Sequence, residues 1–189
     1  GVVLLVLVLG RLAAAQEGLV GYGPFDGSGA DLSGGGRDVV LAGGVGFAPG
    51  LFGQALDLPN NGSQFAARPI DDAIYDFGAN DFTVQLWVNF NNTFREQTLI
   101  EKFSGSGGPG WTLTKLNGNA LHFFATPAIV LTSASLSISN NMWHHILVRR
   151  QGTLFQIFYD GSMVVQGSSG GVISDTGMPL LVGKRNQFD

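Results

Sequence analysis

Apolar and polar residues alternate along much of this chain, most regularly over residues 82–90, which read FTVQLWVNF. Successive side chains of an extended strand point to opposite faces of a sheet. The alternation therefore predicts a long strand with one apolar face and an opposite face that carries Trp87. The residues predicted to face a core are Phe82, Val84, Leu86 and Val88.

Shorter segments of the same kind follow one another along the chain. The clearer ones are residues 98–102, 111–116, 120–125, 130–132, 143–149, 154–159, 163–166 and 180–183, and the weaker ones are 19–25, 39–42, 55–58 and 65–67. Sequences rich in glycine and asparagine separate them and are typical of turns. One of these, Asp160-Gly161, predicts a tight hairpin, because both residues tolerate the positive φ angles of a type I′ turn.

No segment shows a helical period over three turns. A single helical turn is expected within residues 69–75, where Pro69 suits the first position and Asp71 and Asp72 suit the cap. The 29 glycines among 189 residues are enough for many turns. Many short strands without crossover helices predict an all-β fold, either a sandwich or a barrel, with antiparallel pairing.

Residues 1–15, GVVLLVLVLGRLAAA, have a different character. The apolar run over residues 2–9, followed by small residues at 13–15, is typical of a signal peptide, here a partial one. The run is shorter than the roughly 20 residues of a membrane-spanning helix. Cleavage after Ala15 would give a secreted protein that begins at Gln16, and residues 1–15 would then lie outside the folded domain. The alternative is a buried strand at the start of the domain.

The composition narrows the classes of partner and chemistry. Hydrophobic residues make up 44% of the chain and charged residues 13%, which favours one packed domain over disorder. The net charge is −4 and the 10 lysines and arginines form no basic run, so nucleic acid is not expected as a partner. The chain has no cysteine, which excludes thiol catalysis and cysteine-ligated metals.

Seven short sequences stand out by their order and spacing. They are GLVGYGPFDG at 18–27, FGQAL at 52–56, DFTVQLWV at 81–88, LIEK at 99–102, MWHHILV at 142–148, YDG at 159–161 and LLVG at 180–183. Together they resemble the laminin-G-like family of the concanavalin A-like lectin and glucanase superfamily. The resemblance implies a two-sheet antiparallel jelly-roll sandwich. The family closes with a further long strand that carries an acidic residue, so we expect the domain, residues 16–189, to be C-terminally truncated and to lack that last strand.

Catalytic chemistry is not expected. His144 and His145 are adjacent on a predicted strand, so their side chains point to opposite faces and cannot bind one metal together. We expect one of the two to be buried and hydrogen-bonded. Glycoside hydrolysis requires two carboxylates roughly 5–9 Å apart, and no pair of acids at positions i and i+2 lies within a predicted strand. The chain is therefore interpreted as not an enzyme.

Two tryptophans are candidates for ligand contact, because an exposed aromatic ring can stack on a sugar ring. Trp111 follows the glycine-rich segment 104–110, and Trp87 lies opposite the apolar face of its strand. The alternative for each ring is ordinary packing in the fold or under a loop.

A structural calcium site is predicted at Asp26 and Asp31. Their segment resembles the part of the family in which aspartates and backbone carbonyls can surround calcium. Calcium prefers about six to eight oxygen ligands, and a glycine-rich loop can turn its carbonyls inward. The alternative is that both carboxylates accept hydrogen bonds within turns, as aspartates in loops commonly do.

These observations predict a secreted, non-catalytic recognition module that binds a glycan or the surface of an extracellular protein. Two alternatives stay open. The chain could be a structural or adhesive module of a larger surface protein, or an accessory domain of a downstream glycoside hydrolase. The sequence leaves the identity of the ligand and the oligomeric state open, because one fold can carry many different sites.

Overall fold

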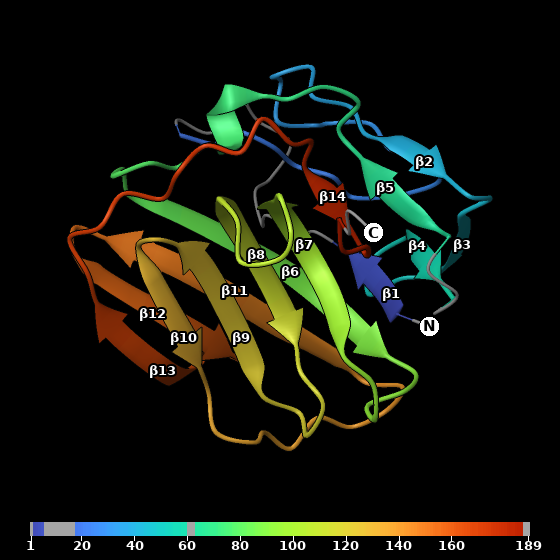
Figure 1. Cartoon of the computed structure of the whole chain (residues 1–189). Coiled ribbons are helices and arrows are strands. Elements are labelled where there is room, and N and C mark those ends of the chain that lie inside the picture. The colour runs from blue at the N-terminus through green and yellow to red at the C-terminus, as the bar shows by residue number, and fades with distance from the viewer. Residues whose placement is uncertain (1, 6–17, 60–62, 187–189) are drawn as a thin grey trace.

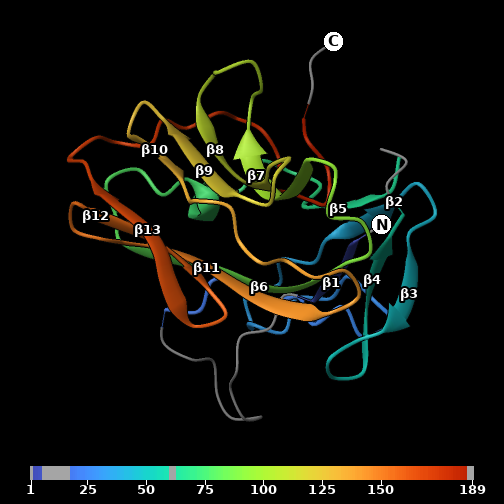
Figure 2. The same cartoon turned by 90° about the horizontal axis from the view of Figure 1, so that it is seen from below.

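The alternating segments form two seven-stranded antiparallel sheets that pack face to face, as Figures 1 and 2 show. The computed structural model describes residues 2–5, 18–59 and 63–186. Sheet A has the strand order β13 (Ser162–Ser168), β12 (Leu154–Tyr159), β11 (Trp143–Gln151), β6 (Phe82–Phe90), β1 (Val2–Leu5), β4 (Gln54–Leu58) and β3 (Gly46–Pro49). Sheet B has the order β10 (Ile129–Thr132), β9 (Leu121–Thr126), β8 (Gly110–Lys115), β7 (Gln97–Phe103), β14 (Leu181–Val182), β5 (Phe65–Ala67) and β2 (Val40–Ala42). The predicted all-β jelly-roll sandwich is confirmed.

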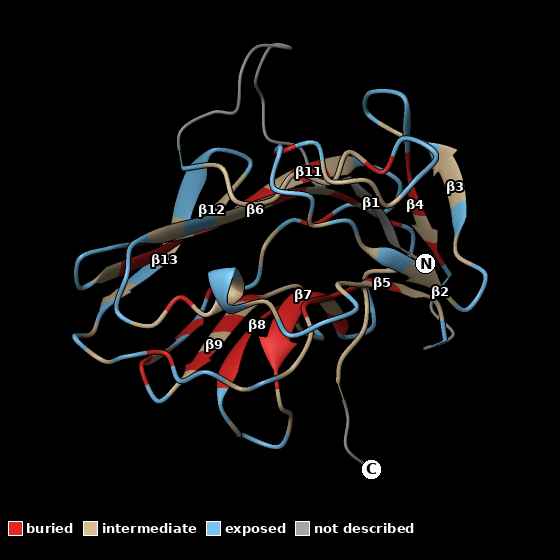
Figure 3. Ribbon diagram, turned by 90° about the horizontal axis from the view of Figure 1, so that it is seen from above, coloured by how far each residue is buried: buried red, intermediate tan, exposed pale blue. Residues whose placement is uncertain are grey.

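The core lies between the two sheets, and β6 contributes one whole face to it. Leu86 and Val88 are completely buried, while Phe82 and Val84 are half-buried and pack against the core. The inward face predicted for this strand is therefore confirmed. In Figure 3 the buried residues of sheet B gather on β7 and β8, the strands at the centre of that sheet.

The predicted hairpin turn and the predicted helical turn are both present in the structure. Asp160 and Gly161 join β12 to β13 with φ angles of 47° and 80°, the positive values expected of a type I′ hairpin. The single helical turn is a 3₁₀ turn, η1 (Ala73–Tyr75), shorter than the segment expected. Asp72 caps it by accepting a hydrogen bond from the N–H of Ile74.

Two expectations about strands are wrong. Residues 19–25 form no strand, because their backbone groups bond to loops and side chains: the N–H of Tyr22 donates to Asp31, and the carbonyl of Val20 accepts from Arg37. Conversely, β3 was not expected, because its first residue is Gly46 and its last is Pro49, and both residue types are uncommon within strands. Its place at the edge of sheet A tolerates both residues, since an edge strand needs ladder partners on one side alone.

The expectation that residues 1–15 lie outside the sandwich is wrong for Val2–Leu5. The backbone of β1 pairs with β4 on one side and with β6 on the other, in the middle of sheet A. Valine and leucine suit a buried strand as well as they suit the apolar part of a signal peptide, so composition alone does not separate the two interpretations. Residue 1 and residues 6–15 lie outside the described part of the chain, and the signal peptide stays a prediction. Within the described part, no helix is long and apolar enough to cross a membrane.

Candidate functional site

Two tryptophans lie together on the side of sheet A that faces away from sheet B. Trp87 of β6 alternates with the buried Leu86 and Val88, and Trp143 of β11 lies opposite Asn89, two residues further along β6 and on the same face. Both rings are half-buried and pack around Ala55 together with Tyr22. We call this surface, formed by Trp87, Trp143 and Tyr22, the aromatic face.

Polar side chains border the aromatic face. His145, the ladder partner of Trp87, places its ring centroid 5.1 Å from the Trp87 ring, and its Nε2 lies 3.2 Å from Oε1 of Gln85. Burial lowers the pKa of His145, more than the nearby Asp160 raises it, so the imidazole is neutral near pH 7. A neutral imidazole and an amide each offer both a donor and an acceptor. The aromatic face therefore combines flat apolar rings with hydrogen-bonding groups at its border.

Trp111, the other predicted ligand contact, is not at the surface. Its ring is 1% exposed, stacks on Phe77 with centroids 4.9 Å apart, and donates from Nε1 to the carbonyl of Tyr75 at 2.9 Å. A signal for this was present in the sequence, because Trp111 alternates in step with Leu113, so the two share the inward face of β8. Stacking on a sugar at the surface requires an exposed ring, which Trp111 does not have. It lines a cavity that is partly open to solvent instead.

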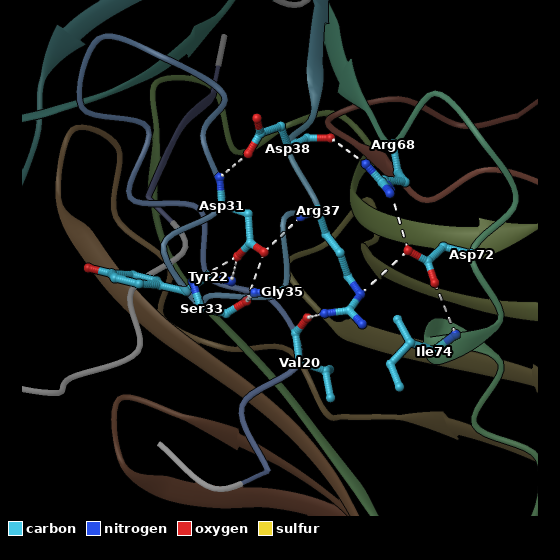
Figure 4. Close-up of polar contacts among 10 residues, drawn as sticks. All are labelled: Val20, Tyr22, Asp31, Ser33, Gly35, Arg37, Asp38, Arg68, Asp72 and Ile74. Atoms are coloured by element: carbon cyan, nitrogen blue, oxygen red, sulfur yellow. Dashed lines mark hydrogen bonds and ion pairs between the residues drawn. The ribbon is translucent and has the colours of Figure 1, made fainter. Parts of the chain in front are cut away.

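The predicted calcium ligands, Asp26 and Asp31, lie in the segment that precedes β2, and Figure 4 shows the contacts of Asp31. Both carboxylate oxygens of Asp31 accept hydrogen bonds: Oδ1 from the N–H groups of Tyr22 and Ser33, and Oδ2 from the hydroxyl of Ser33 and the N–H of Arg37, all at 2.8–2.9 Å. Burial alone would raise the pKa of Asp31, but these donors lower it below its usual value. Asp26 accepts from the N–H of Gln54 at 3.0 Å. Asp31 thus makes the local hydrogen bonds that were the alternative to calcium, whereas Asp26 accepts from a residue 28 positions away in the chain.

Arg37 connects this loop to the segment before η1 (Figure 4). Its guanidinium donates to the carbonyl of Val20 at 3.1 Å and lies 3.5 Å from the carboxylate of Asp72. Arg68 approaches the same Asp72 oxygen at 3.4 Å. These contacts join the Asp31 loop to the segment before η1.

Replacing Asp31 with alanine is expected to lower the free energy of unfolding by about 1–3 kcal/mol, because several partly buried N–H groups lose their acceptor. The loss should be equal in calcium and in chelator if the carboxylate acts through hydrogen bonds. Denaturant melts of the wild type and Asp31→Ala in both buffers measure this. Calcium binding by Asp26 and Asp31 stays a prediction, and a wild-type midpoint that rises with calcium while the Asp31→Ala midpoint does not would support it.

Each of the three histidines has at least one ring nitrogen within hydrogen-bonding distance of a neighbouring side chain. His144 is buried, and its Nδ1 lies 2.8 Å from Asp160 and 2.7 Å from the hydroxyl of Tyr159. His145 points to the other face of β11, as expected. His122 contacts Thr132 at 2.9 Å on sheet B. The prediction that one of the adjacent histidines is buried and hydrogen-bonded is confirmed.

Three carboxylates that the sequence did not predict to be neighbours lie close together in the structure. In the described part of the chain, Asp71, Asp76 and Asp175 form the one set of three or more potential ligands close enough to share a cation. The ammonium of Lys102 already lies among them, at 2.7, 2.5 and 3.5 Å respectively, and its side chain is completely buried. The lysine therefore supplies the positive charge here. Four separate positions along the chain meet at this point, which no local pattern indicates.

Comparisons with known proteins agree with this architecture. Residues 60–189 match a family model described as the Concanavalin A-like lectin/glucanases superfamily. No curated protein sequence matches the chain.

Among solved structures, the binding domain of Paraclostridial Mosquitocidal Protein 1 has a TM-score of 0.66 and 21% identity, and the match covers 83% of this chain and 42% of that one. Domain 4 of AbnA, an extracellular arabinanase from Geobacillus stearothermophilus, has a TM-score of 0.66 and 17% identity over 86% of this chain and 81% of that one. Domains LG4-5 of the mouse laminin alpha1 chain have a TM-score of 0.52 and 17% identity over 82% and 38%. At these identities the likeness shows the fold, and the chain spans less than half of the first and third structures.

Proposed function

The chain belongs to the Concanavalin A-like lectin/glucanases superfamily, and from this premise we propose that it is a secreted, non-catalytic recognition module that binds a glycan on its aromatic face. The observation that carries the proposal is the pair Trp87 and Trp143, which lie on the outer side of sheet A, on neighbouring strands, and both pack against Ala55. Neither ring belongs to the main core between the sheets.

The chemistry of the aromatic face suits a sugar. A pyranose or furanose ring has an apolar face of C–H groups, which can pack on an indole, and a rim of hydroxyls, which need donors and acceptors. His145 and Gln85 offer both kinds of group next to Trp87. Because both tryptophans project from strands of one sheet, the platform is held in place before a ligand arrives, and less conformational entropy is lost on binding.

Two of the similar structures support a glycan as the ligand. Domain 4 of AbnA was solved in complex with arabinotriose, and a binding domain of botulinum neurotoxin DC was solved in complex with SialylT. Each of these statements concerns that protein. The proposal that the module is non-catalytic rests on the buried and half-buried carboxyl groups, which already have structural partners. Asp31 accepts hydrogen bonds within its loop, Asp76 pairs with the Lys102 ammonium, and Glu101 accepts from the N–H of Asn186.

Replacing Trp87 with alanine is expected to weaken glycan binding by about fivefold to 150-fold, because stacking on an aromatic ring contributes roughly 1–3 kcal/mol. The variant is also expected to lose about 1–3 kcal/mol of stability, because the ring covers the buried Ala55, so its folding is checked by a denaturant melt before its affinity is measured. A glycan array screened with the wild type identifies the ligand, and titration calorimetry of both proteins with it measures the loss.

The matched control is Phe94→Ala, which removes an aromatic ring that is 85% exposed in the loop between β6 and β7 and is not part of the cluster around Ala55. It should bind the glycan as the wild type does. Unchanged affinity in both Trp87→Ala and Trp143→Ala would show that the ligand binds elsewhere on the molecule.

A further inference from the structure

Tyr22 belongs to the aromatic face but does not project from a strand. The two tryptophans lie on β6 and β11, whereas residues 19–25 form no strand. Gly21 and Gly23 flank Tyr22, and glycine has the greatest backbone freedom of all residues. Glycine is required at position 21, because an added Cβ would lie 2.6 Å from the hydroxyl of Tyr75. The position of the Tyr22 ring must therefore come from contacts other than sheet pairing.

The Asp31 loop supplies such contacts. The N–H of Tyr22 donates to Oδ1 of Asp31 at 2.9 Å, and the carbonyl of Tyr22 accepts from the N–H of Leu32 at 2.8 Å. Two residues earlier, the carbonyl of Val20 accepts from the guanidinium of Arg37 at 3.1 Å. Figure 4 shows the ring of Tyr22 pointing away from the carboxylate that binds its backbone. The loop thus holds both backbone groups of Tyr22, and the ring packs on the aromatic face.

Asp31 fixes the loop as well as Tyr22. Its Oδ1 also accepts from the N–H of Ser33, two residues later, and its Oδ2 accepts from the N–H of Arg37, six residues later. One carboxylate therefore closes the loop on itself and joins it to Tyr22. Without that carboxylate, the N–H of Tyr22 and the loop that holds its carbonyl both lose a contact.

The ring that is held in this way lies beside the two tryptophans. Tyr22, Trp87 and Trp143 all pack against Ala55, which is completely buried. We propose that Asp31 is a positioning residue for glycan binding, because it fixes the backbone of Tyr22 so that the ring contacts the glycan next to the tryptophans. This inference rests on the function proposed above. A ring that is already in place loses less conformational entropy when the ligand binds.

The first test is a cycle of affinities, measured by titration calorimetry with the glycan that the array identifies. All proteins are measured in chelator, so that calcium has no part in the result. Asp31→Ala is expected to weaken binding roughly twofold to twelvefold, the equivalent of ordering one side chain on binding. In a protein that already carries Tyr22→Ala, the same substitution should change the affinity less than about twofold, because the ring that Asp31 positions is gone.

The second test needs no ligand. A nuclear Overhauser effect between the ring protons of Tyr22 and the methyl group of Ala55 reports where the ring lies. It should be present in the wild type and lose most of its intensity in Asp31→Ala. The matched control is Ser133→Ala, which removes the acceptor of the N–H of Leu121 in sheet B, a 3.0 Å hydrogen bond. A comparable loss of stability is expected there, with both the Overhauser effect and the affinity unchanged.

Three results would overturn the proposal alone while the aromatic face still binds a glycan. The first is an unchanged Overhauser effect in Asp31→Ala, and the second is an equal loss of affinity with and without the Tyr22 ring. The third is a Ser133→Ala protein that loses as much affinity as Asp31→Ala. Failure of the proposed function gives a different result, which also removes the basis of this inference: the affinity is then the same in wild type, Trp87→Ala, Trp143→Ala and Asp31→Ala.

Discussion

Replacing Lys102 with methionine is expected to lower the free energy of unfolding by about 3 kcal/mol, one of the two largest effects foreseen for this protein. The lysine ammonium is completely buried and is the cation for Asp71, Asp76 and Asp175. Burial alone would lower the pKa of Lys102, but the carboxylates of Asp71 and Asp76 raise it above its usual value, so the amine is charged. Methionine would fill the space but leave the carboxylate of Asp76, which is 15% exposed, without its cation.

Urea denaturation of the wild type and Lys102→Met measures this effect. Adding Asp76→Asn to Lys102→Met should recover part of the lost stability, because the neutral amide needs no cation. The matched control is Lys184→Met, where the lysine contacts the ring of Phe65 at 4.3 Å and a loss below about 1 kcal/mol is expected. A Lys102→Met protein as stable as Lys184→Met would contradict the structural role given to Lys102.

The second large effect is a fall in stability between pH 4.5 and pH 7 that comes from Glu101. This residue of β7 is completely buried. Burial raises the pKa of Glu101 to about 7, although the N–H of Asn186, the hydroxyl of Thr112 and the charge of Arg185 all act to lower it. Its Oε2 has no hydrogen-bond partner in the described part of the structure. The charged form is therefore disfavoured in the folded protein.

The direction of the pH effect follows from proton binding. The unfolded carboxyl loses its proton near pH 4.5, whereas the folded one keeps it until about pH 7. Between these values the folded state binds the extra proton, so the contribution of Glu101 is fully present below pH 4.5 and is lost as the pH rises to 7. The loss amounts to at most about 3 kcal/mol.

Glu101→Gln is expected to remove this dependence. The amide stays neutral, so the stability of the variant relative to the wild type should rise from pH 4.5 to pH 7 and then stay constant. Denaturant melts of both proteins across this range measure the difference. The control is Glu96→Gln, whose carboxylate is 41% exposed and pairs with Arg185 at 2.7 Å. A difference between Glu101→Gln and wild type that does not change with pH would show that Glu101 is charged throughout.

Local pattern was sufficient for most of the strands and for the direction in which many side chains point. The alternation over residues 82–90 predicted both the length of β6 and its buried face, since a period of two reports directly which side chains leave water. The Asp160-Gly161 hairpin was predictable for a similar reason, because its φ angles depend on the two residues themselves. Trp87 was assigned to the outer face on the same basis.

Local pattern was not sufficient for the candidate site. Trp143 was not among the predicted ligand contacts, and its place on the same face as Trp87 depends on the register between β11 and β6, which are more than 50 residues apart in the chain. Asp31 was matched to a metal-binding segment, but its oxygens meet N–H groups that the fold of the loop brings together. Residues 2–5 combine an export-like composition with a place inside sheet A, and only strand pairing separates these interpretations.

By itself, then, the sequence determined that this is an all-β protein, where most of its strands lie and which of their faces are buried, because these properties depend on the order of apolar and polar residues within a few positions. The tertiary structure alone decided that Lys102 meets three carboxylates, that Glu101 is removed from water, and that two tryptophans share one face. Each of these depends on the order and register of strands distant in the chain. Register results from the packing of the whole sandwich, and no single segment encodes it.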